Sequence, residues 1–314
     1  MTLPRLSHFW TGDKRWLQAG AAIIVLSIIL GILTLFFPIV QKPPSQTAVL
    51  PTFSSERLSS VRVTAKAAIV YDLTTGETLY EKNAEAQLPL ASLTKLLTVY
   101  AALGAIPKET RITISDSALA VEGESGLALG ESFTFERLAK LALVASSNDA
   151  AAAIAETAST KKGVAKAALM GSAITAAKLT QTYAVNGTGL DESTNVSGAY
   201  GSARDVALLS GALLAAAPEL ASATVSNSVS VYSEEGALHT LQNTNQHVSS
   251  QPGTLLSKTG FTDLAGGNLA VVFDASFNHP IAVVVLGSTK EGRFSDVEAL
   301  MDATLDGFAY PDAP

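Results

Sequence analysis

Segments typical of β-strands occur near both ends of this sequence, and helical periodicity fills the region between them. Two short runs, Ala67–Leu73 and Thr78–Glu81, flank a turn that contains glycine and predict a β-hairpin. The later runs LAVVFDAS and PIAVVVLGS, joined by the turn Phe277–Pro280, predict an antiparallel pair, and a closing helix is expected over 295–308. Alanine and leucine recur with helical spacing over 92–216. We therefore expect an α+β fold, with an antiparallel sheet and an inserted helical lobe.

An uncharged segment precedes these elements. No charged residue occurs from Trp16 to Val40, and the stretch AAIIVLSIILGILTLFFPIV is almost wholly apolar. Because a bilayer core of about 30 Å requires about 20 helical residues, this segment is long enough to span a membrane. A cleaved signal peptide is the alternative, but its apolar core would be shorter, and FFPIVQKPP contains no A-x-A cleavage site. We predict a single uncleaved transmembrane helix at 16–40, with the lipid bilayer as its partner.

The charges that flank this helix predict its orientation. Lys14 and Arg15 precede it and no comparable basic cluster follows directly, so the positive-inside rule places residues 1–15 in the cytoplasm. Residues 41–60 mix Pro, Ser, Thr and Gln without apolar periodicity and predict a flexible tether. Residues 61–314 are then expected to form one catalytic domain on the extracytoplasmic side of the cell membrane.

Composition excludes several classes of function. A net charge of −7 argues against a nucleic-acid partner, because phosphate binding requires a basic surface. The sequence contains no cysteine, which excludes disulfides, thiolate metal ligands and a cysteine nucleophile. The four histidines, at positions 8, 239, 247 and 279, show no metal-ligand spacing. We therefore expect neither a metal site nor a cofactor.

The first motif with chemical potential is Ser92-Leu-Thr-Lys95, at the start of the apolar run LTKLLTVYAAL. Serine favours helix N-termini, and residues i and i+3 share a helix face, which brings Lys95 beside the Ser92 hydroxyl. Apolar surroundings lower the pKa of a lysine and let it act as a neutral base. Taken alone, the pair is also consistent with a helix cap and a lysine that reaches solvent. Ser159-Thr-Lys-Lys162 matches the same pattern, but its polar context predicts a solvated turn.

Two further motifs follow in order. Ser146-Ser-Asn148 lies between two helical patterns, where it could relay a proton and hold a peptide carbonyl, although Ser and Asn are also ordinary helix caps. Lys258-Thr-Gly260 precedes the C-terminal strand pair. On an edge strand Lys258 would add a fixed positive charge, Thr259 would add a hydroxyl donor, and Gly260 would let a substrate approach the backbone. A polar strand end is the alternative, but the three motifs in this order are much rarer than any one of them.

This ordered set is typical of penicillin-binding proteins and class A β-lactamases. The chain resembles the serine D-alanyl-D-alanine carboxypeptidases, which are low-molecular-mass penicillin-binding proteins. The likeness extends over about 67–308 and includes AAIVYDLTTGETLYEKN, LPLASLTKLLTVYAAL, LALVASSNDAAAAIAE, NGTGLD, GSARDVALL, NTNQ, SKTGFTDLAGGNLAVV and EGRFSD. The resemblance implies a β-lactamase/transpeptidase-like fold. In that fold a five-stranded antiparallel sheet packs against a helical cluster, and the site lies in the cleft between them.

The resemblance also implies a reaction. The enzyme would remove the terminal D-alanine from peptidoglycan stem pentapeptides, and β-lactam antibiotics would act as covalent inhibitors. Ser92 would attack the carbonyl between the two D-alanines, with Lys95 as its base. Ser146 would pass the proton to the leaving amine, Asn148 would bind the peptide, and Lys258 would give electrostatic support.

The substrate-binding residues are implied in the same way. The backbone N–H groups of Ser92 and Phe261 would form the oxyanion hole, a donor pair worth a few kcal/mol at a transition state. Thr259 and Arg293 would receive the terminal carboxylate, and Gly260 and Phe261 complete the predicted substrate-binding residues.

The chain departs from the family pattern in two places. Members usually carry Met-Asn where this chain has Met170-Gly171, so a supporting hydrogen bond is in question. Many members also carry a small β-rich C-terminal domain, and here the N-terminal anchor would replace a C-terminal membrane attachment.

Three alternatives remain open at this stage. A β-lactamase would need a deacylating carboxylate in an E-x-x-x-N pattern, where this chain reads GLDESTN. An endopeptidase or a transpeptidase could use the same residues. A catalytically inactive wall-binding protein would lack a motif residue, and all of them are present.

Overall fold

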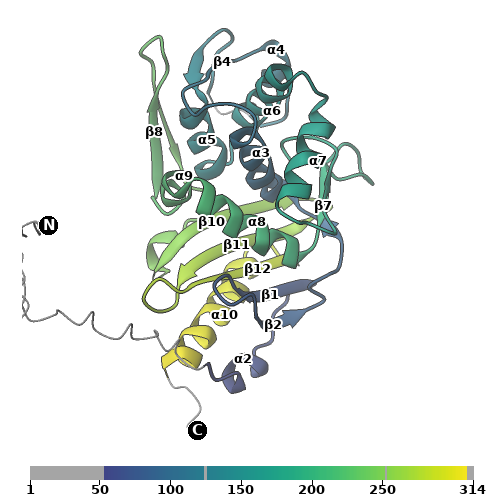
Figure 1. Cartoon of the computed structure of the whole chain (residues 1–314), viewed down its shortest axis with the longest axis vertical. Coiled ribbons are helices and arrows are strands. Elements are labelled where there is room, and N and C mark those ends of the chain that lie inside the picture. The colour runs from purple at the N-terminus through teal and green to yellow at the C-terminus, as the bar shows by residue number, and fades with distance from the viewer. Residues whose placement is uncertain (1–52, 124–125, 252, 310–314) are drawn as a thin grey trace, which may run out of the picture. The chain divides into compact units, whose positions relative to one another are not determined.

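Strands from both ends of the chain pair into one sheet in the computed structural model (Figure 1), which describes residues 53–123, 126–251 and 253–309. The sheet has the order β10-β11-β12-β1-β2, and every neighbouring pair is antiparallel. Its strands are β1 (Ala67–Asp72), β2 (Thr78–Lys82), β10 (Thr254–Thr262), β11 (Gly266–Asp274) and β12 (Pro280–Ser288). The predicted α+β class, the N-terminal hairpin and the C-terminal strand pair are confirmed.

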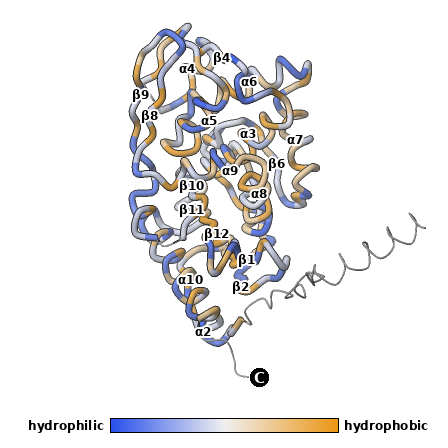
Figure 2. Tube along the Cα trace, turned by 60° about the vertical axis from the view of Figure 1, so that its left-hand side comes forward, coloured by the Kyte–Doolittle hydropathy of each residue, from blue (hydrophilic) through white to orange (hydrophobic). Residues whose placement is uncertain are grey.

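Helices cover both faces of this sheet. Successive strand side chains point to opposite faces, so along β12 Val284 and Leu286 enter one core while Val283 and Val285 enter the other. A strand buried on both faces has a continuous apolar sequence, as β12 does. Figure 2 shows the layers from another side, with α8 (Ala203–Ala216) and α10 (Gly292–Ala309) on opposite sides of β12. The predicted closing helix is confirmed and begins three residues earlier than expected.

A helical lobe is inserted between β2 and β10 and contains most of the larger core (Figure 1). Its helices are η1 (Ala91–Leu93), α3 (Thr94–Leu103), α4 (Asp116–Leu119), α5 (Phe135–Val144), α6 (Asn148–Lys162), α7 (Lys166–Ala176), α8, α9 (Pro218–Ala223) and η2 (Val248–Ser250). Its short strands are β3 (Leu88–Pro89), β4 (Arg111–Thr113), β5 (Ser132–Thr134), β6 (Tyr183–Ala184), β7 (Ala199–Gly201), β8 (Ser228–Tyr232) and β9 (Leu238–Gln242). Helix α3 runs through this lobe with eight of its ten residues buried, which takes Lys95 into the interior.

The first described residues correct the predicted boundary of the tether. Residues 53–60 are packed on the domain: the Phe53 ring lies 5.1 Å from the Phe308 ring, and Leu58 of α2 (Glu56–Ser60) is fully buried beside α10. These two apolar side chains attach the stretch together with the Ser54 N–H bond to the Gly307 carbonyl oxygen and the Arg57–Asp306 ion pair, and the polar composition concealed them. The rest of the predicted tether, 41–52, and the predicted anchor at 16–40 lie outside the described residues. Within the described ranges, no helix combines the length and hydrophobicity needed to cross a bilayer.

Gly171, the departure noted in the sequence, lies inside α7, where a Cβ atom would meet no other heavy atom within 4 Å. Because glycine is about 1 kcal/mol less favourable than alanine in a helix interior, Gly171→Ala should raise the free energy of unfolding by about that amount. Urea denaturation measures this change.

Gly211 in α8 provides the matched control. A Cβ atom there would lie 2.6 Å from Leu73 Cδ2, so the end of the Leu73 side chain must move, and Gly211→Ala should stabilise the protein less than Gly171→Ala although it makes the same helix-favouring change. Equal stabilisation by both substitutions would contradict the packing seen around these two glycines.

Candidate active site

The Ser92 hydroxyl and the Lys95 amine lie together at the start of the buried helix. Ser92 is in η1, and Lys95 is in the first turn of α3. Lys95 Nζ lies 2.8 Å from Ser92 Oγ and donates a second hydrogen bond of 2.9 Å to the Thr188 carbonyl oxygen. The predicted contact between the two side chains is confirmed.

Burial changes the chemistry of Lys95. Its side chain is fully buried, and this loss of hydration lowers the pKa of Lys95 to about 7. About half of the molecules then carry a neutral amine at pH 7. Such an amine can accept the proton of the Ser92 hydroxyl across the 2.8 Å contact.

Two glycines allow the tight packing around the nucleophile turn. Ala91 has a φ of +48°, a strained conformation for a residue with a side chain. A Cβ on Gly189, which has a φ of +79°, would lie 1.8 Å from the Ala91 carbonyl oxygen, and one on Gly260 would lie 2.9 Å from the Leu90 carbonyl oxygen. Gly260 was expected to admit a substrate chain, but on its Cβ side it makes room for the turn that holds Ser92.

The two serines of the second motif have different surroundings: one caps a helix, and the other lies beside the third motif. Ser147 caps α6, because its Oγ accepts the backbone N–H of Ala150 at 3.1 Å. Ser146 instead adopts a φ of +60° between α5 and α6, and its Oγ accepts a hydrogen bond of 2.9 Å from Lys258 Nζ. The cap interpretation therefore holds for Ser147, while Ser146 faces the third motif.

Asn148 is the first residue of α6 and is only partly engaged. Its Nδ2 donates to the Glu122 carbonyl oxygen at 2.7 Å. Its Oδ1 is buried and has no hydrogen-bond partner among the described residues. A buried acceptor without a partner is costly, so this oxygen is available for an N–H group of a bound peptide.

Lys258 lies on β10, which is the edge strand of the sheet, as the motif predicted. Its amine is buried and donates to Ser146 Oγ and, at 2.9 Å, to the Thr259 carbonyl oxygen. Burial, followed by the charges of Lys95 and Arg293, holds the pKa of Lys258 well below its usual value. The expected positive charge on Lys258 is therefore less favoured than it would be in water, first because the amine is buried and second because Lys95 and Arg293 lie nearby.

The other residues predicted to bind substrate lie along the same strand. Thr259 is buried and its Oγ1 donates to Thr244 Oγ1 at 2.6 Å, whereas Phe261 is 43% exposed. Arg293 is buried at the start of α10, where one guanidinium nitrogen donates to the Gly260 carbonyl oxygen at 2.8 Å. Its Nε has no hydrogen-bond partner in the described part of the chain. The Arg293 guanidinium thus lies directly beside Gly260. In the chain, Gly260 stands between Thr259 and Phe261.

The sequence-level motifs missed the loop that holds Lys95. Asn186 organises this loop, because its Oδ1 accepts the N–H groups of Thr188 and Gly189, and this directs the Thr188 carbonyl toward Lys95. The block NGTGLD at 186–191, which belongs to the resemblance to the family, was the sequence signal for this loop, but no role was predicted for its residues. Its pairing with α3 depends on tertiary packing.

The competing S-x-x-K match does not form a pair. Ser159 Oγ donates to the Glu156 carbonyl, and Lys162 Nζ donates to the Gly104 carbonyl. Both residues lie at the end of α6 rather than in the turn that the polar composition predicted. In the described ranges, no group of three or more His, Asp or Glu residues could hold a metal ion.

Asp191 joins the loop that holds Lys95 to the turn after β10. Its carboxylate accepts from Thr262 Oγ1 at 3.0 Å and from the Leu264 N–H at 3.3 Å. Asp191→Ala should slow acylation by a penicillin about 10-fold. The substitution removes the hydrogen bonds that hold the Lys95 loop against the turn after β10, and this should raise the activation free energy of acylation by about 1.4 kcal/mol. The measurement is the rate of covalent labelling by a fluorescent penicillin.

Asp263 supplies the matched control, since it lies in the same turn and is exposed. Asp263→Ala should leave the labelling rate unchanged. Equal slowing by both substitutions would show that the local negative charge, rather than the Asp191 contacts, determines the labelling rate.

Comparison with known proteins agrees with this geometry. The family profile described as D-alanyl-D-alanine carboxypeptidase, peptidase S11, matches residues 54–290. The chain belongs to the D-alanyl-D-alanine carboxypeptidase family S11. This S11 member is 30% identical over 264 residues to D-alanyl-D-alanine carboxypeptidase DacF of Bacillus subtilis, a match that covers 79% of this chain and 64% of DacF. It spans less than two thirds of the length of the curated carboxypeptidases that it matches first.

Two other similarities concern the whole S11 domain. A D-alanyl-D-alanine endopeptidase of Escherichia coli is 28% identical over 283 residues, which are 86% of each chain. The structure of penicillin-binding protein D2 from Listeria monocytogenes in its cefotaxime-bound form is 28% identical, with a TM-score of 0.66. That match covers 78% of this chain and 98% of the Listeria chain. The fold expected from the resemblance is confirmed for the sheet and the helical lobe.

Proposed function

We propose that this S11 member is a serine D-Ala-D-Ala carboxypeptidase that removes the terminal D-alanine from peptidoglycan stem pentapeptides. The observation that supports this most is a pair of contacts, each between a buried lysine amine and a serine hydroxyl. Lys95 Nζ lies 2.8 Å from Ser92 Oγ, and Lys258 Nζ lies 2.9 Å from Ser146 Oγ. A nucleophile with its own buried base, beside a second hydroxyl that can relay a proton, is what acyl transfer through a serine requires.

The reaction begins at Ser92. The neutral Lys95 amine takes the hydroxyl proton while Oγ attacks the carbonyl carbon between the two D-alanines. The backbone N–H groups of Ser92 and Phe261 stabilise the oxyanion. As the carbon–nitrogen bond breaks, Ser146 donates its hydroxyl proton to the leaving D-alanine nitrogen and regains a proton, namely the one that Lys95 took up. Water later hydrolyses the acyl-enzyme, which releases the shortened peptide and restores the Ser92 hydroxyl.

Substrate binding adjusts the charge of the cleft. The terminal carboxylate of the peptide binds near Thr259 and Arg293, and its negative charge raises the pKa of Lys258 toward the charged form. The free Oδ1 of Asn148 accepts a peptide N–H. β-Lactams acylate Ser92 in the same way, and the Listeria relative was solved in cefotaxime-bound and ampicillin-bound forms. No cofactor takes part in this scheme.

We further propose that the segment 16–40 anchors the protein in the cell membrane, with the catalytic domain on the extracytoplasmic side. The uncharged length of this segment and the preceding Lys14 and Arg15 support this arrangement. The peptidoglycan substrate lies on the same side.

An endopeptidase is the second candidate, because the Escherichia coli endopeptidase matches over 86% of both chains. Incubation with a pentapeptide and with a crosslinked peptide dimer separates the two activities. Release of D-alanine from the pentapeptide with the dimer left intact supports the carboxypeptidase, whereas dimer cleavage alone contradicts it. Sustained turnover of a chromogenic β-lactam would instead indicate a β-lactamase.

A further inference from the structure

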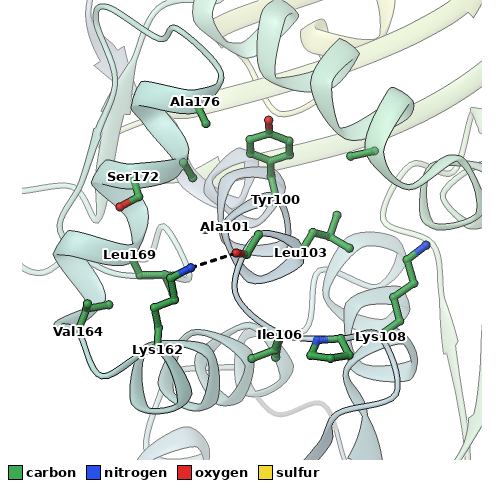
Figure 3. A pocket seen from close by; sticks show the side chains of 14 residues that line it. Tyr100, Ala101, Leu103, Ile106, Lys108, Lys162, Val164, Leu169, Ser172 and Ala176 are labelled. Carbon is green, nitrogen blue, oxygen red and sulfur yellow. Dashed lines mark hydrogen bonds between the residues drawn. The ribbon is translucent and has the colours of Figure 1, made fainter.

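A cavity of about 600 Å³ lies at the end of α3 that is remote from Ser92 (Figure 3). Its walls come from the last residues of α3 and the loop after it, from α7, and from the C-terminal ends of α6 and α8. Tyr100 is the α3 residue of the lining that lies first along the chain, eight residues after Ser92, so the cavity begins about 12 Å along the helix from the nucleophile. It is therefore separate from the catalytic cleft.

The lining of this cavity is mainly aliphatic. Four alanines keep it hollow because their side chains are short, namely Ala101, Ala173, Ala176 and Ala216. Leucine, isoleucine and valine side chains supply much of the remaining surface, and Val164 at the rim is 40% exposed. Water in such a cavity has few polar partners, so an apolar ligand that displaces it gains free energy.

Two lysines stand at the rim, and only one of them is neutralised. Lys108 forms an ion pair with Glu219. Lys162 makes no ion pair within the described residues, and its only hydrogen bond there is a long one of 3.3 Å to the Gly104 carbonyl oxygen. Figure 3 shows this bond with the Lys162 side chain reaching over the cavity. A long, exposed bond leaves the ammonium group able to pair with an anion at the mouth.

We propose that this cavity binds a single-chain amphiphile with an anionic head, such as a medium-chain fatty acid. The alkyl chain lies among the alanines and aliphatic side chains, and the carboxylate pairs with Lys162. The Glu219 carboxylate already neutralises Lys108, so the head is directed to Lys162 and not to the opposite rim. The volume falls within the range of about 300–1,000 Å³ that is usual for small-molecule sites.

Photolabelling of the full chain in nanodiscs of uncharged lipid tests this proposal. The probe is a decanoate that carries a diazirine on its chain, and mass spectrometry identifies the labelled peptides. The expected labels lie in 101–107 and 169–176. Unlabelled decanoate should compete more effectively than decanol, by up to about 5-fold, since an exposed ion pair contributes up to about 1 kcal/mol. Labelling confined to other peptides, or equal competition by decanol, would overturn the proposal.

Two kinds of variant test the Lys162 charge and the cavity volume separately. Lys162→Met should abolish the preference for decanoate over decanol, whereas Lys161→Met, on the same exposed helix end but outside the lining, should preserve it. Ala173→Leu should fill the cavity and remove labelling, with Ala176→Leu at the exposed rim as a second filling variant. Urea denaturation verifies that each variant is folded. Unchanged labelling in a folded filling variant would show that the probe binds elsewhere.

Discussion

Acylation by a fluorescent penicillin is expected to disappear when Ser92 is replaced by alanine. The substitution removes the only atom proposed to form the covalent bond, and loss of a serine nucleophile lowers turnover by about 10⁴ to 10⁶-fold. The side chain is small and partly exposed, so the free energy of unfolding should change by less than about 1 kcal/mol. The measurement is the fluorescent protein band after incubation with the penicillin.

Ser159→Ala is the matched control for this experiment. Ser159 belongs to the second S-x-x-K match, but among the described residues its hydroxyl bonds only to the Glu156 carbonyl oxygen. The Ser159→Ala protein should be labelled like the wild type. Persistent labelling of Ser92→Ala would refute the nucleophile assignment and, with it, the proposed mechanism.

Replacement of Lys95 by methionine should reduce the rate of acylation by at least about 10³-fold, because the substitution removes the proposed base. In the wild type, the pKa of about 7 predicts a rate that rises about 10-fold per pH unit below pH 7 and levels off above it. The rate of penicillin labelling between pH 5 and 9 gives this profile. A rate independent of pH across this range would contradict Lys95 as the base.

The lowered pKa of Lys95 also predicts how the free energy of unfolding changes with pH. Burial lowers the pKa of Lys95 from 10.5 to about 7, so between these values the unfolded chain binds more protons than the folded one. The contribution of Lys95 to the free energy of unfolding should therefore rise by about 4 kcal/mol as the pH increases from 7 to 10.5, and the lowered pKa of Lys258 adds to the rise in the same direction. Lys95→Met should lose this contribution and be more stable at pH 7. The exposed Lys162→Met serves as the control and should keep the wild-type slope.

The interior of the cleft was only partly predictable from the sequence. The i, i+3 spacing was enough to bring Lys95 to Ser92, since helix geometry is local. The pKa of Lys258 was not predictable, because it depends first on burial and then on the charges of Lys95 and Arg293, which reach the same place from distant parts of the chain. The division between Ser146 and Ser147 was equally hidden, since both residues are suitable caps and only the backbone conformation at 146 selects one.

The boundary at the start of the domain illustrates the same limit. Residues 53–60 have the composition of a linker, but Phe53 and Leu58 find partners on α10 at the other end of the chain. Composition reports the average of a segment, whereas attachment depends on single apolar contacts.

The sequence by itself determined four strands of the main sheet, the closing helix and the order of the three motifs, because periodicity and short spacings act within one element. The tertiary structure decided what those motifs can do. It buries Lys95 and Lys258, packs Gly189 and Gly260 against the turn that presents Ser92, and leaves a hollow at the far end of α3. These features arise where segments distant in the sequence pack together and exclude water. Loss of hydration, rather than residue type alone, determines whether a lysine side chain stays charged or acts as a neutral base.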